Sequence, residues 1–505
     1  METNQDLIAL KCAFEERSSL SGINYEIKER SDGKILIMYL ANPTERFYRI
    51  LEDCLKATVG EGEVPSLMAT LKKSAAPNLL KSAEGRLLQR TLVESLNINR
   101  HSFKDDFFAR YTKSVSGAEE QIVARANNIV FGRRGAGKSS LLLYGSHMSK
   151  RNMQATIWVD MQVYSGRQDS SVAIDLFLHI LKEVAPKLSA SAAIGELKST
   201  LEEMRLVEVM DEVKLRKLLP RIREVLSEFG NLNQTLMIYL DDYHVIGKAI
   251  QHRVLDFLYS VTRGNNIYIK ISAIESLTQT YDSATKAGMQ IQHDITVINL
   301  DYNLTMPEKA TEHITSILDA HASYCGLPAI RSLCTSTDAL ARLVWVSAGV
   351  PRDALSIFSQ AMTRTALSNG RKVSVSSVNI ASSETVNVKM KELDADASED
   401  AVALKDLFQG LQDFALKQNR KNAFLVEINN NDTIYQKIIK LIDLRLLHVI
   451  SEGTSTGDVG KKYLALIIDY GFYTGIRAAR SVDLFNKQTK KVLYRDLRTL
   501  PVYAK

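Results

Sequence analysis

The sequence predicts an α/β protein whose central part is a parallel sheet covered by helices, with an all-helical segment and a smaller domain after it. Between residues 105 and 300, short apolar segments alternate with longer segments of helical periodicity, the pattern of strands joined by crossover helices. From 305 to about 390 only helical periodicity remains. A chain of 505 residues is also too long for one core, so several domains are expected.

Five apolar segments are expected to form the strands of this sheet, and one long helical stretch with charged faces, 171–229, separates the second strand from the third. The expected strands are 127–132, 155–161, 235–242, 266–273 and 294–300. A polar segment near 385–400, poor in aromatic residues, is expected to be a linker. The predicted domains are a mixed α+β module (1–100), the sheet domain (101–304), a helical lid (305–390) and a carboxy-terminal domain with a basic tail (391–505).

The amino-terminal module is expected to contain a hairpin, because two strand-like runs flank Ser31, Asp32 and Gly33. A helix is expected at 44–60, where apolar residues recur at helical spacing and a glycine ends the run. Nothing in this module carries recognisable chemistry. We therefore expect it to bind protein partners.

The net charge of +6 is carried entirely by the carboxy-terminal end. Residues 401–505 hold 17 Lys and Arg against 10 Asp and Glu, whereas the first 400 residues hold 47 against 48. Such asymmetry favours a polyanion as partner of this end, and a solvated basic surface without a partner is the alternative.

Cysteine usage and hydropathy indicate a cytoplasmic protein. Four cysteines, Cys12, Cys54, Cys325 and Cys334, are scattered without the close spacing of a disulfide framework or a metal site, so four reduced thiols are expected. No uncharged apolar run is long enough to span a membrane, and the amino terminus lacks the pattern of an export signal.

A glycine-rich loop between the first strand and a helix predicts a phosphate-binding site. Its residues satisfy GxxxxGK[ST] and are Gly132, Arg133, Arg134, Gly135, Ala136, Gly137, Lys138 and Ser139, followed by Ser140. The glycines let backbone N–H groups converge on phosphate oxygens at the helix amino terminus. Lys138 would reach the β and γ phosphates, and Ser139 would bind Mg²⁺. The motif and its context predict a P-loop nucleotide-binding domain.

The acidic end of strand 235–242 supplies the expected partner of this loop. Asp241 would emerge at the same edge of the sheet and bind Mg²⁺, and Asp242 would polarise the attacking water. Many nucleotide hydrolases of this kind carry Glu at the second position, so the shorter Asp242 predicts slow hydrolysis. A plain acidic turn after a strand is the alternative.

Two further polar residues near this edge are candidates for the reaction. Ser272 ends the next strand and would hydrogen-bond the γ-phosphate or the water, or it is an ordinary strand-end serine. Arg263 would act as an arginine finger on a neighbouring subunit of a homo-oligomer, or it is a solvated loop residue.

The stretch "SAGVPRDALSIF", 347–358, resembles the second sensor of AAA+ ATPases, especially those of the origin-recognition (initiator) family. That resemblance implies that Arg352 reaches from the lid to the γ-phosphate, and that the nucleotide is ATP. No guanine-reading NKxD element is present, and Phe108 and Tyr111 are candidates to stack on adenine. Nucleotide-switch signalling ATPases (the STAND type) are also similar, but they usually lack the arginine after the proline.

The initiator family also places a winged helix after its lid, and residues 401–475 show the matching order of helix, strand, helix and two-stranded wing. Few side chains suited to reading base edges are present, so contacts to DNA phosphates are expected. The candidates are Lys437, Lys440, Lys461 and Lys462, with Arg477, Arg480, Lys487, Lys490 and Lys491 in the tail. Docking of proteins is the alternative role for a winged helix.

Together these features predict an ATP-binding, slowly hydrolysing protein that couples its nucleotide state to DNA binding. The alternative is an ATP-dependent signalling or assembly switch, with little turnover, whose winged helix and amino-terminal module bind proteins.

Overall fold

The computed structural model describes most of the chain, and its residues form two compact units. One unit comprises Met1–Asn97, Asp105–Thr112 and Tyr302–Lys505, and the other comprises Ile98–Lys104 and Lys113–Asp301. The described residues are 4–31, 33–58, 68–74, 78–101, 105–114, 116–188, 191–206, 212–232, 235–300, 307–395, 399–429, 431–455, 461–474, 482–483, 485 and 492–503.

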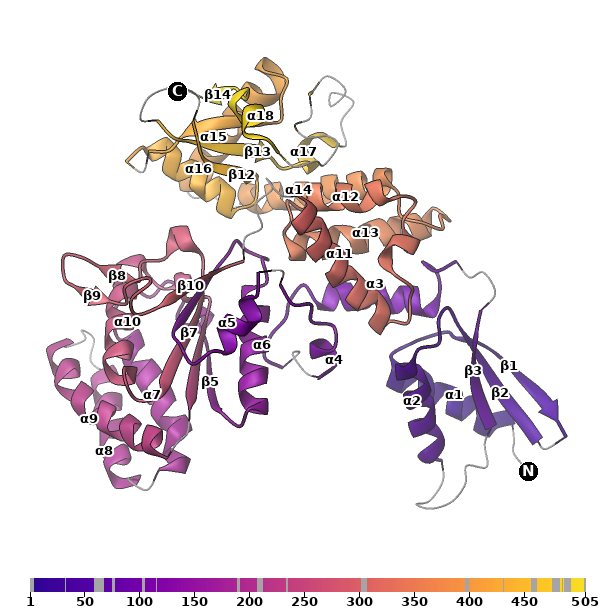
Figure 1. Ribbon diagram of the computed structural model, residues 1–505, viewed down its shortest axis with the longest axis horizontal. Coiled ribbons are helices and arrows are strands. Elements are labelled where there is room, and N and C mark those ends of the chain that lie inside the picture. Colours follow the sequence, from indigo (N-terminus) through magenta and orange to yellow (C-terminus); the bar gives the residue numbers. More distant parts are fainter. Residues whose placement is uncertain are drawn as a thin grey trace. The chain divides into compact units, whose positions relative to one another are not determined.

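The second unit is built on a five-stranded sheet in the order β10-β4-β7-β6-β5, with every neighbouring pair parallel (Figure 1). The strands are β4 (Asn128–Phe131), β5 (Ala155–Asp160), β6 (Leu236–Asp241), β7 (Ile267–Ala273) and β10 (Thr296–Asn299). All five predicted strands are confirmed. This parallel sheet with crossover helices is the α/β architecture of a P-loop nucleotide-binding domain.

Helices cover this sheet, which explains why its strands are apolar along their whole length. The helices are α5 (Ala118–Val123), α6 (Lys138–Arg151), α7 (Val172–Val184), α8 (Ser191–Arg205), α9 (Glu212–Asn231) and α10 (Lys248–Thr262). One strand face, with Ile238 and Ile269, joins the core formed with α7 to α10. The other face meets α6, where the Tyr239 hydroxyl lies 3.1 Å from the Ser149 hydroxyl. The stretch 171–229, expected as one helical region, therefore consists of α7, α8 and α9.

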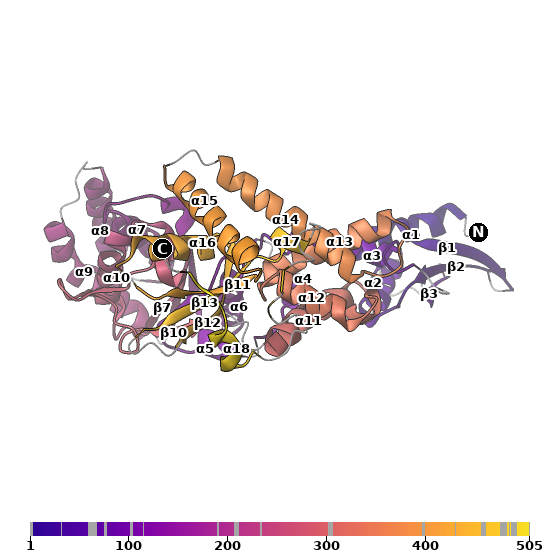
Figure 2. The same cartoon turned by 90° about the horizontal axis from the view of Figure 1, so that it is seen from above.

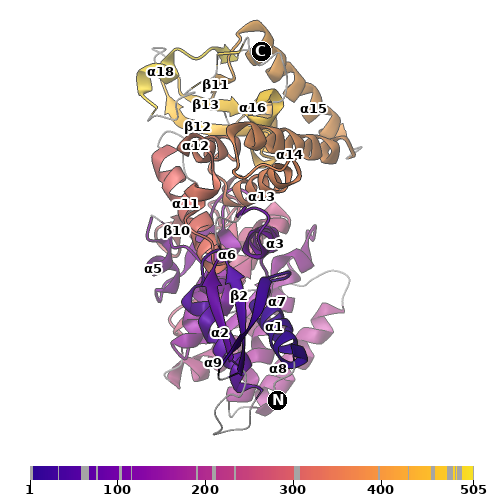
Figure 3. The ribbon, with the colours of Figure 1, turned by 90° about the vertical axis from the view of Figure 1, so that its right-hand side faces the viewer.

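The amino-terminal residues form a three-stranded sheet that packs on helices (Figure 3). Its elements are α1 (Asn4–Ser18), β1 (Asn24–Arg30), β2 (Gly33–Leu40), α2 (Glu45–Lys56), β3 (Met68–Lys73) and α3 (Ala83–Glu94). The predicted hairpin is confirmed as the antiparallel pair β1 and β2. Strand β3, parallel to β2, and helix α1 were not predicted. Helix α3 packs against α11 and α13 of the lid.

The expected helical lid is confirmed as four helices: α11 (Pro307–Tyr324), α12 (Thr337–Val346), α13 (Pro351–Leu367) and α14 (Val375–Ala395). A short helix, α4 (Asp105–Phe108), belongs to the same unit. The expected linker at 385–400 is wrong over most of its length, because α14 continues through Ala395 and α15 begins at Glu399 (Figure 2). The buried face of α14, which includes Val378, Ala381 and Val386, keeps this polar sequence helical.

The carboxy-terminal residues show the expected order of helix, strand, helix and hairpin. They form α15 (Glu399–Gln412, continued by a π-helix over Asp413–Gln418), β11 (Ala423–Glu427), α16 (Thr433–Asp443), β12 (Leu447–Thr454), β13 (Tyr463–Ile468), α17 (Gly471–Thr474), α18 (Tyr494–Arg498) and β14 (Val502–Tyr503). The sheet order is β12-β13-β11-β14, and the last strand, parallel to β11, was not predicted.

One continuous core connects the amino-terminal module, the lid and the carboxy-terminal domain. The amino-terminal module, the lid and the carboxy-terminal domain together form one compact unit. Their division into three separate domains therefore remains a prediction. Within the described part of the chain, no helix combines the length and the apolar character needed to cross a membrane.

Candidate nucleotide site

The glycine-rich loop lies where the sequence predicts, between the end of β4 and the start of α6 at Lys138. Gly135 and Gly137 adopt φ angles of 84° and 98°, a region that only glycine enters at low cost. A Cβ added to Gly132 would lie 3.1 Å from the Ala136 Cβ, so the loop is also closely packed at its base. This backbone brings the loop over the amino terminus of a 14-residue helix, which favours an anion.

The charged side chains of the loop differ in exposure. Lys138 is buried, and its Nζ donates a hydrogen bond to the Arg133 carbonyl oxygen at 3.1 Å. The ammonium group is thereby held at the loop itself. Arg133 and Ser140 are half-buried, whereas Arg134 is exposed. The loop therefore concentrates positive charge at the amino terminus of α6.

The two predicted Mg²⁺ ligands already contact each other. The Ser139 hydroxyl donates to Asp241 Oδ1 at 3.0 Å, and the Ser272 hydroxyl donates to the same oxygen at 2.5 Å. Ser272 occupies this position because β7 lies between β4 and β6 in the sheet. The strand order thus explains why the end of a third strand joins the loop and the acid.

The electrostatics of Asp241 fit a cation. Burial raises the pKa of Asp241 to about 6, the neighbouring charges of Asp242 and Asp160 act in the same direction, and the two serine hydroxyls oppose them. A carboxylate and a hydroxyl are the hard oxygen ligands that Mg²⁺ prefers, and a bound cation would favour the ionised carboxylate. The residues present therefore fit Mg²⁺, which Ser139 and Asp241 would hold beside the phosphates.

Asp242 is held in an uncommon backbone conformation beside this acid. It adopts the left-handed conformation (φ 57°, ψ 45°), and its N–H donates to the Ser272 hydroxyl at 2.8 Å. Its carboxylate accepts a hydrogen bond from Gln162 Nε2 at 3.3 Å, and the other oxygen lies 4.0 Å from His244 Nδ1. Burial lowers the pKa of His244 to about 4 against the opposing charge of Asp242, so this imidazole is neutral at pH 7.

Sequence reasoning missed Gln162 and His244. Gln162 follows β5, whose last residue, Asp160, is paired in register with Asp241. Since the carboxyl ends of neighbouring parallel strands meet at one edge, the polar residues after β5 were a usable signal. His244 lies in the turn after β6, and nothing in its local pattern distinguishes it from an ordinary turn residue.

The site residues predicted on the lid lie in the other compact unit. Arg352 is exposed in the first turn of α13, directly after Pro351. Phe108 and Tyr111 are half-buried and belong to the unit of the lid. Contacts of these three residues with a nucleotide remain predictions. Arg263 is exposed after α10, with its guanidinium 5.7 Å from the centre of the Tyr259 ring, and its role as a finger is likewise a prediction.

The predicted phosphate-contact lysines lie on two elements of the carboxy-terminal domain. Lys437 and Lys440 are on α16, half-buried and exposed respectively, and Lys461 and Lys462 are exposed just before β13. Lys461 forms an exposed ion pair with Glu427 at 2.9 Å. The five tail candidates, Arg477, Arg480, Lys487, Lys490 and Lys491, lie outside the described residues.

The cysteines form no part of this site. Cys54, Cys325 and Cys334 are buried and Cys12 is exposed, all as free thiols. Among the described residues there is also no group of three or more His, Cys, Asp or Glu side chains that would hold a metal ion.

Comparison with solved structures gives low identities over most of the chain. The Orc1 protein of Aeropyrum pernix in complex with DNA is 13% identical, with a TM-score of 0.40, over 72% of this chain and 92% of that one. The Drosophila ORC bound to DNA is 12% identical, with a TM-score of 0.38, over 85% and 99%. The Cdc6p of Pyrobaculum aerophilum is 12% identical, with a TM-score of 0.34, over 78% and 92%.

The chain is thus similar, at low identity, to the Orc1, ORC and Cdc6p structures. No family model matches the sequence, and no curated protein matches it either. The capacity of the site to bind phosphate and Mg²⁺ is therefore argued from the glycine-rich loop, the strand order and the carboxylates of Asp241 and Asp242.

Proposed function

We propose that the chain binds Mg²⁺–ATP at the loop 132–140 and hydrolyses it slowly. The observation that carries this proposal is the hydrogen bond between Ser139 and Asp241 at 3.0 Å. A hydroxyl at the start of the helix and a half-buried carboxylate two strands away meet at one point, where a cation beside the phosphates would lie.

The residues around this point divide the work of phosphoryl transfer. Lys138 and the loop N–H groups hold the β and γ phosphates, and Ser139 and Asp241 hold Mg²⁺, which supplies charge neutralisation when bound. Asp242 orients the attacking water, and Ser272 contributes a hydrogen bond to the γ-phosphate or that water. Arg352 contacts the γ-phosphate from the lid. Slow turnover fits an Asp242 carboxylate that is short and already engaged by Gln162 at 3.3 Å.

The nucleotide state is proposed to control DNA binding by the carboxy-terminal domain. The surplus of positive charge beyond residue 400 supports contacts to DNA phosphates. One observation favours the alternative of an assembly switch: α3 of the amino-terminal module packs on α11 and α13 of the lid, so a protein bound there would respond to movement of the lid.

Two substitutions test the nucleotide site in the full-length protein. Lys138→Ala should abolish ATP binding by calorimetry, while Asp242→Asn should bind ATP normally and lose turnover. Lys150→Ala is the matched control, because it removes an exposed lysine at the opposite end of the same helix. Normal ATP affinity in the Lys138→Ala protein would refute the site, and undiminished turnover in the Asp242→Asn protein would remove that residue from the mechanism.

The DNA proposal is tested by the salt dependence of duplex binding in the presence of ATP or ADP. The four candidate lysines of the carboxy-terminal domain are replaced with alanine: Lys437, Lys440, Lys461 and Lys462. The slope of log binding constant against log salt concentration should then become shallower by about 0.9 for each DNA phosphate that a lysine no longer neutralises. A full-length protein that ignores duplex DNA at low salt with either nucleotide would leave the assembly switch as the better account.

A further inference from the structure

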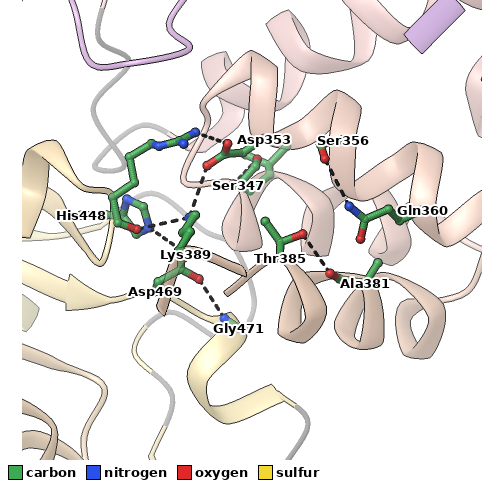
Figure 4. Close-up of polar contacts among 12 residues, drawn as sticks. Ser347, Asp353, Ser356, Gln360, Ala381, Thr385, Lys389, His448, Asp469 and Gly471 are labelled. Atoms are coloured by element: carbon green, nitrogen blue, oxygen red, sulfur yellow. Dashed lines mark hydrogen bonds and ion pairs between the residues drawn. The ribbon is translucent and has the colours of Figure 1, made fainter. Parts of the chain in front are cut away.

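A buried network of ion pairs connects the lid with the carboxy-terminal domain (Figure 4). At its centre is Lys389 on α14, whose Nζ lies 2.8 Å from Asp469 Oδ2 and 3.5 Å from Asp353 Oδ2. The same ammonium donates to the Arg445 carbonyl oxygen at 3.3 Å. Asp353 is on α13, Asp469 directly follows β13, and Arg445 lies between α16 and β12. Four segments far apart in the sequence therefore meet at one charged group.

The network is balanced in charge, and both of its acids are fully engaged. The Arg445 guanidinium pairs with Asp353 Oδ1, the oxygen that Lys389 leaves open. Asp469 Oδ2 also lies 3.1 Å from His448 Nε2, and its Oδ1 accepts a hydrogen bond from the Gly471 N–H at 2.9 Å. The side chains of Asp353, Asp469 and Lys389 are 7%, 2% and 10% exposed. Such desolvated charges persist only while every partner is in place.

The electrostatics agree with this geometry. Burial would raise the pKa of Asp469, but the charge of Lys389 and the hydrogen bond from His448 outweigh burial, so the pKa lies well below its usual range. Burial would also lower the pKa of Lys389, but Asp469 and Asp353 outweigh it and raise that pKa. Both groups are therefore charged at neutral pH.

The network begins next to the residue proposed to sense the γ-phosphate. Asp353 directly follows Arg352 in the first turn of α13, so its two ion pairs fix the end of the helix that carries Arg352. At the other end of the network, α17 packs tightly on α14. A Cβ added to Gly471 would lie only 2.3 Å from Val386 Cγ2 and 2.6 Å from the Ser382 carbonyl oxygen. Neither end can move alone without separating buried charges or opening this contact.

We propose that this Asp353–Lys389–Asp469 network, with Arg445, makes the carboxy-terminal domain follow α13 as one body. Lys389 is then a positioning residue: it acts through Asp353, Asp469 and the Arg445 carbonyl, and it transmits the movement of Arg352 to the lysines on α16. The transmission of the nucleotide state to DNA binding rests on the proposed function. The rigid connection between α13 and the carboxy-terminal domain does not depend on nucleotide binding. Ion pairs suit this role because they are directional and are lost together, whereas apolar contacts can slide.

The rigid connection is tested by single-molecule energy transfer in the nucleotide-free, full-length protein. Labels are attached at Leu367→Cys on α13 and Tyr494→Cys on α18, which are 81% and 70% exposed, in a Cys12→Ser background. The unmodified network should give one narrow distance distribution. Lys389→Met should broaden or shift this distance distribution, whereas Lys389→Arg, which keeps the positive charge, should give the narrow distribution of the unmodified network. Lys391→Met, at an exposed position of the same helix, should leave the distribution unchanged. Asp353→Asn, which keeps the side-chain size, is the second variant if Lys389→Met does not fold.

The transmission is tested by the ratio of duplex-DNA affinities measured with ATP and with ADP. In the Lys389→Met protein this ratio should fall to about one, while the affinity of the protein for ATP itself stays within threefold of wild type. Simple destabilisation of the fold would not produce this pattern. An unchanged distance distribution in both Lys389→Met and Asp353→Asn would overturn the rigid connection. A broadened distribution with a wild-type affinity ratio would overturn the transmission. Failure of the wild-type protein to bind ATP would refute the proposed function, and the energy-transfer result would still decide the connection.

Discussion

Replacing Asp241 with asparagine should make the nucleotide-free protein more stable while removing its response to Mg²⁺–nucleotide. The Asp241 carboxylate is half-buried, and its partial burial raises its pKa from an ordinary value of 3.8 to about 6. Asparagine keeps an Oδ1 that can accept the hydrogen bonds from Ser139 and Ser272. The substitution therefore removes the half-buried charge without removing its acceptor.

The expected gain follows from the size of this shift. Two pKa units correspond to about 3 kcal/mol in the free energy of unfolding at neutral pH. Because the pKa is higher in the fold than in the unfolded chain, the ionised form is unfavourable above about pH 6, and this penalty fades as the pH falls towards 4. For a unit of this size, 3 kcal/mol corresponds to about 6–12 °C in melting temperature.

Thermal unfolding in EDTA at pH 7.5 and pH 5 checks this prediction. Asp241→Asn should melt higher than wild type at pH 7.5, with a smaller difference at pH 5, and only wild type should gain stability from Mg²⁺–ADP. Glu224→Gln is the matched control, since Glu224 is exposed on α9 and its loss of charge should change stability by about 0.5 kcal/mol or less. An Asp241→Asn protein that melts below wild type at pH 7.5 would refute the reasoning.

Two other predictions concern residues that hold charged groups in place. Ser272→Ala removes a hydrogen bond donated to Asp241, so ATP turnover should fall about tenfold while ATP affinity, measured by calorimetry, stays within threefold. If ATP affinity fell as much as ATP turnover, Ser272 would be a residue that binds ATP and not one that acts in the reaction. Asp469→Asn should lower the free energy of unfolding at pH 7 by about 3–5 kcal/mol, because it leaves Lys389 without its nearest acid. Since the pKa of Asp469 is depressed in the fold, the stabilisation is complete above about pH 4 and is lost as the pH falls further. A difference between variant and wild type that persists unchanged at pH 2, measured by denaturant titration, would contradict this.

Local patterns were sufficient for most of the sheet domain. The five strands are short apolar runs between clear helical segments, and the loop motif fixes which strand precedes α6. The contact between Ser139 and Asp241 followed from the same logic, because the carboxyl ends of parallel strands share an edge. The sequence also placed the lid, whose helices have clear apolar faces.

Features that depend on distant partners escaped the sequence analysis. Helix α14 continues through a polar stretch because Val386 and its neighbours pack on α17, a segment about 85 residues later in the chain. Strand β14 pairs with β11, and no local pattern predicts a partner so far away. Lys389 looks like an ordinary charged residue of a solvated helix face, since both of its acids come from other elements.

The binding of Mn²⁺, as a paramagnetic substitute for Mg²⁺, measures the central claim most directly. Electron paramagnetic resonance should show one bound Mn²⁺ per chain that appears only when ADP or ATP is added. Asp241→Asn and Ser139→Ala should lose this signal, while Glu224→Gln, at an exposed position of α9, should keep it. Nucleotide-dependent Mn²⁺ binding of wild-type strength in Asp241→Asn would contradict the assignment of Ser139 and Asp241 as the pair that holds the metal.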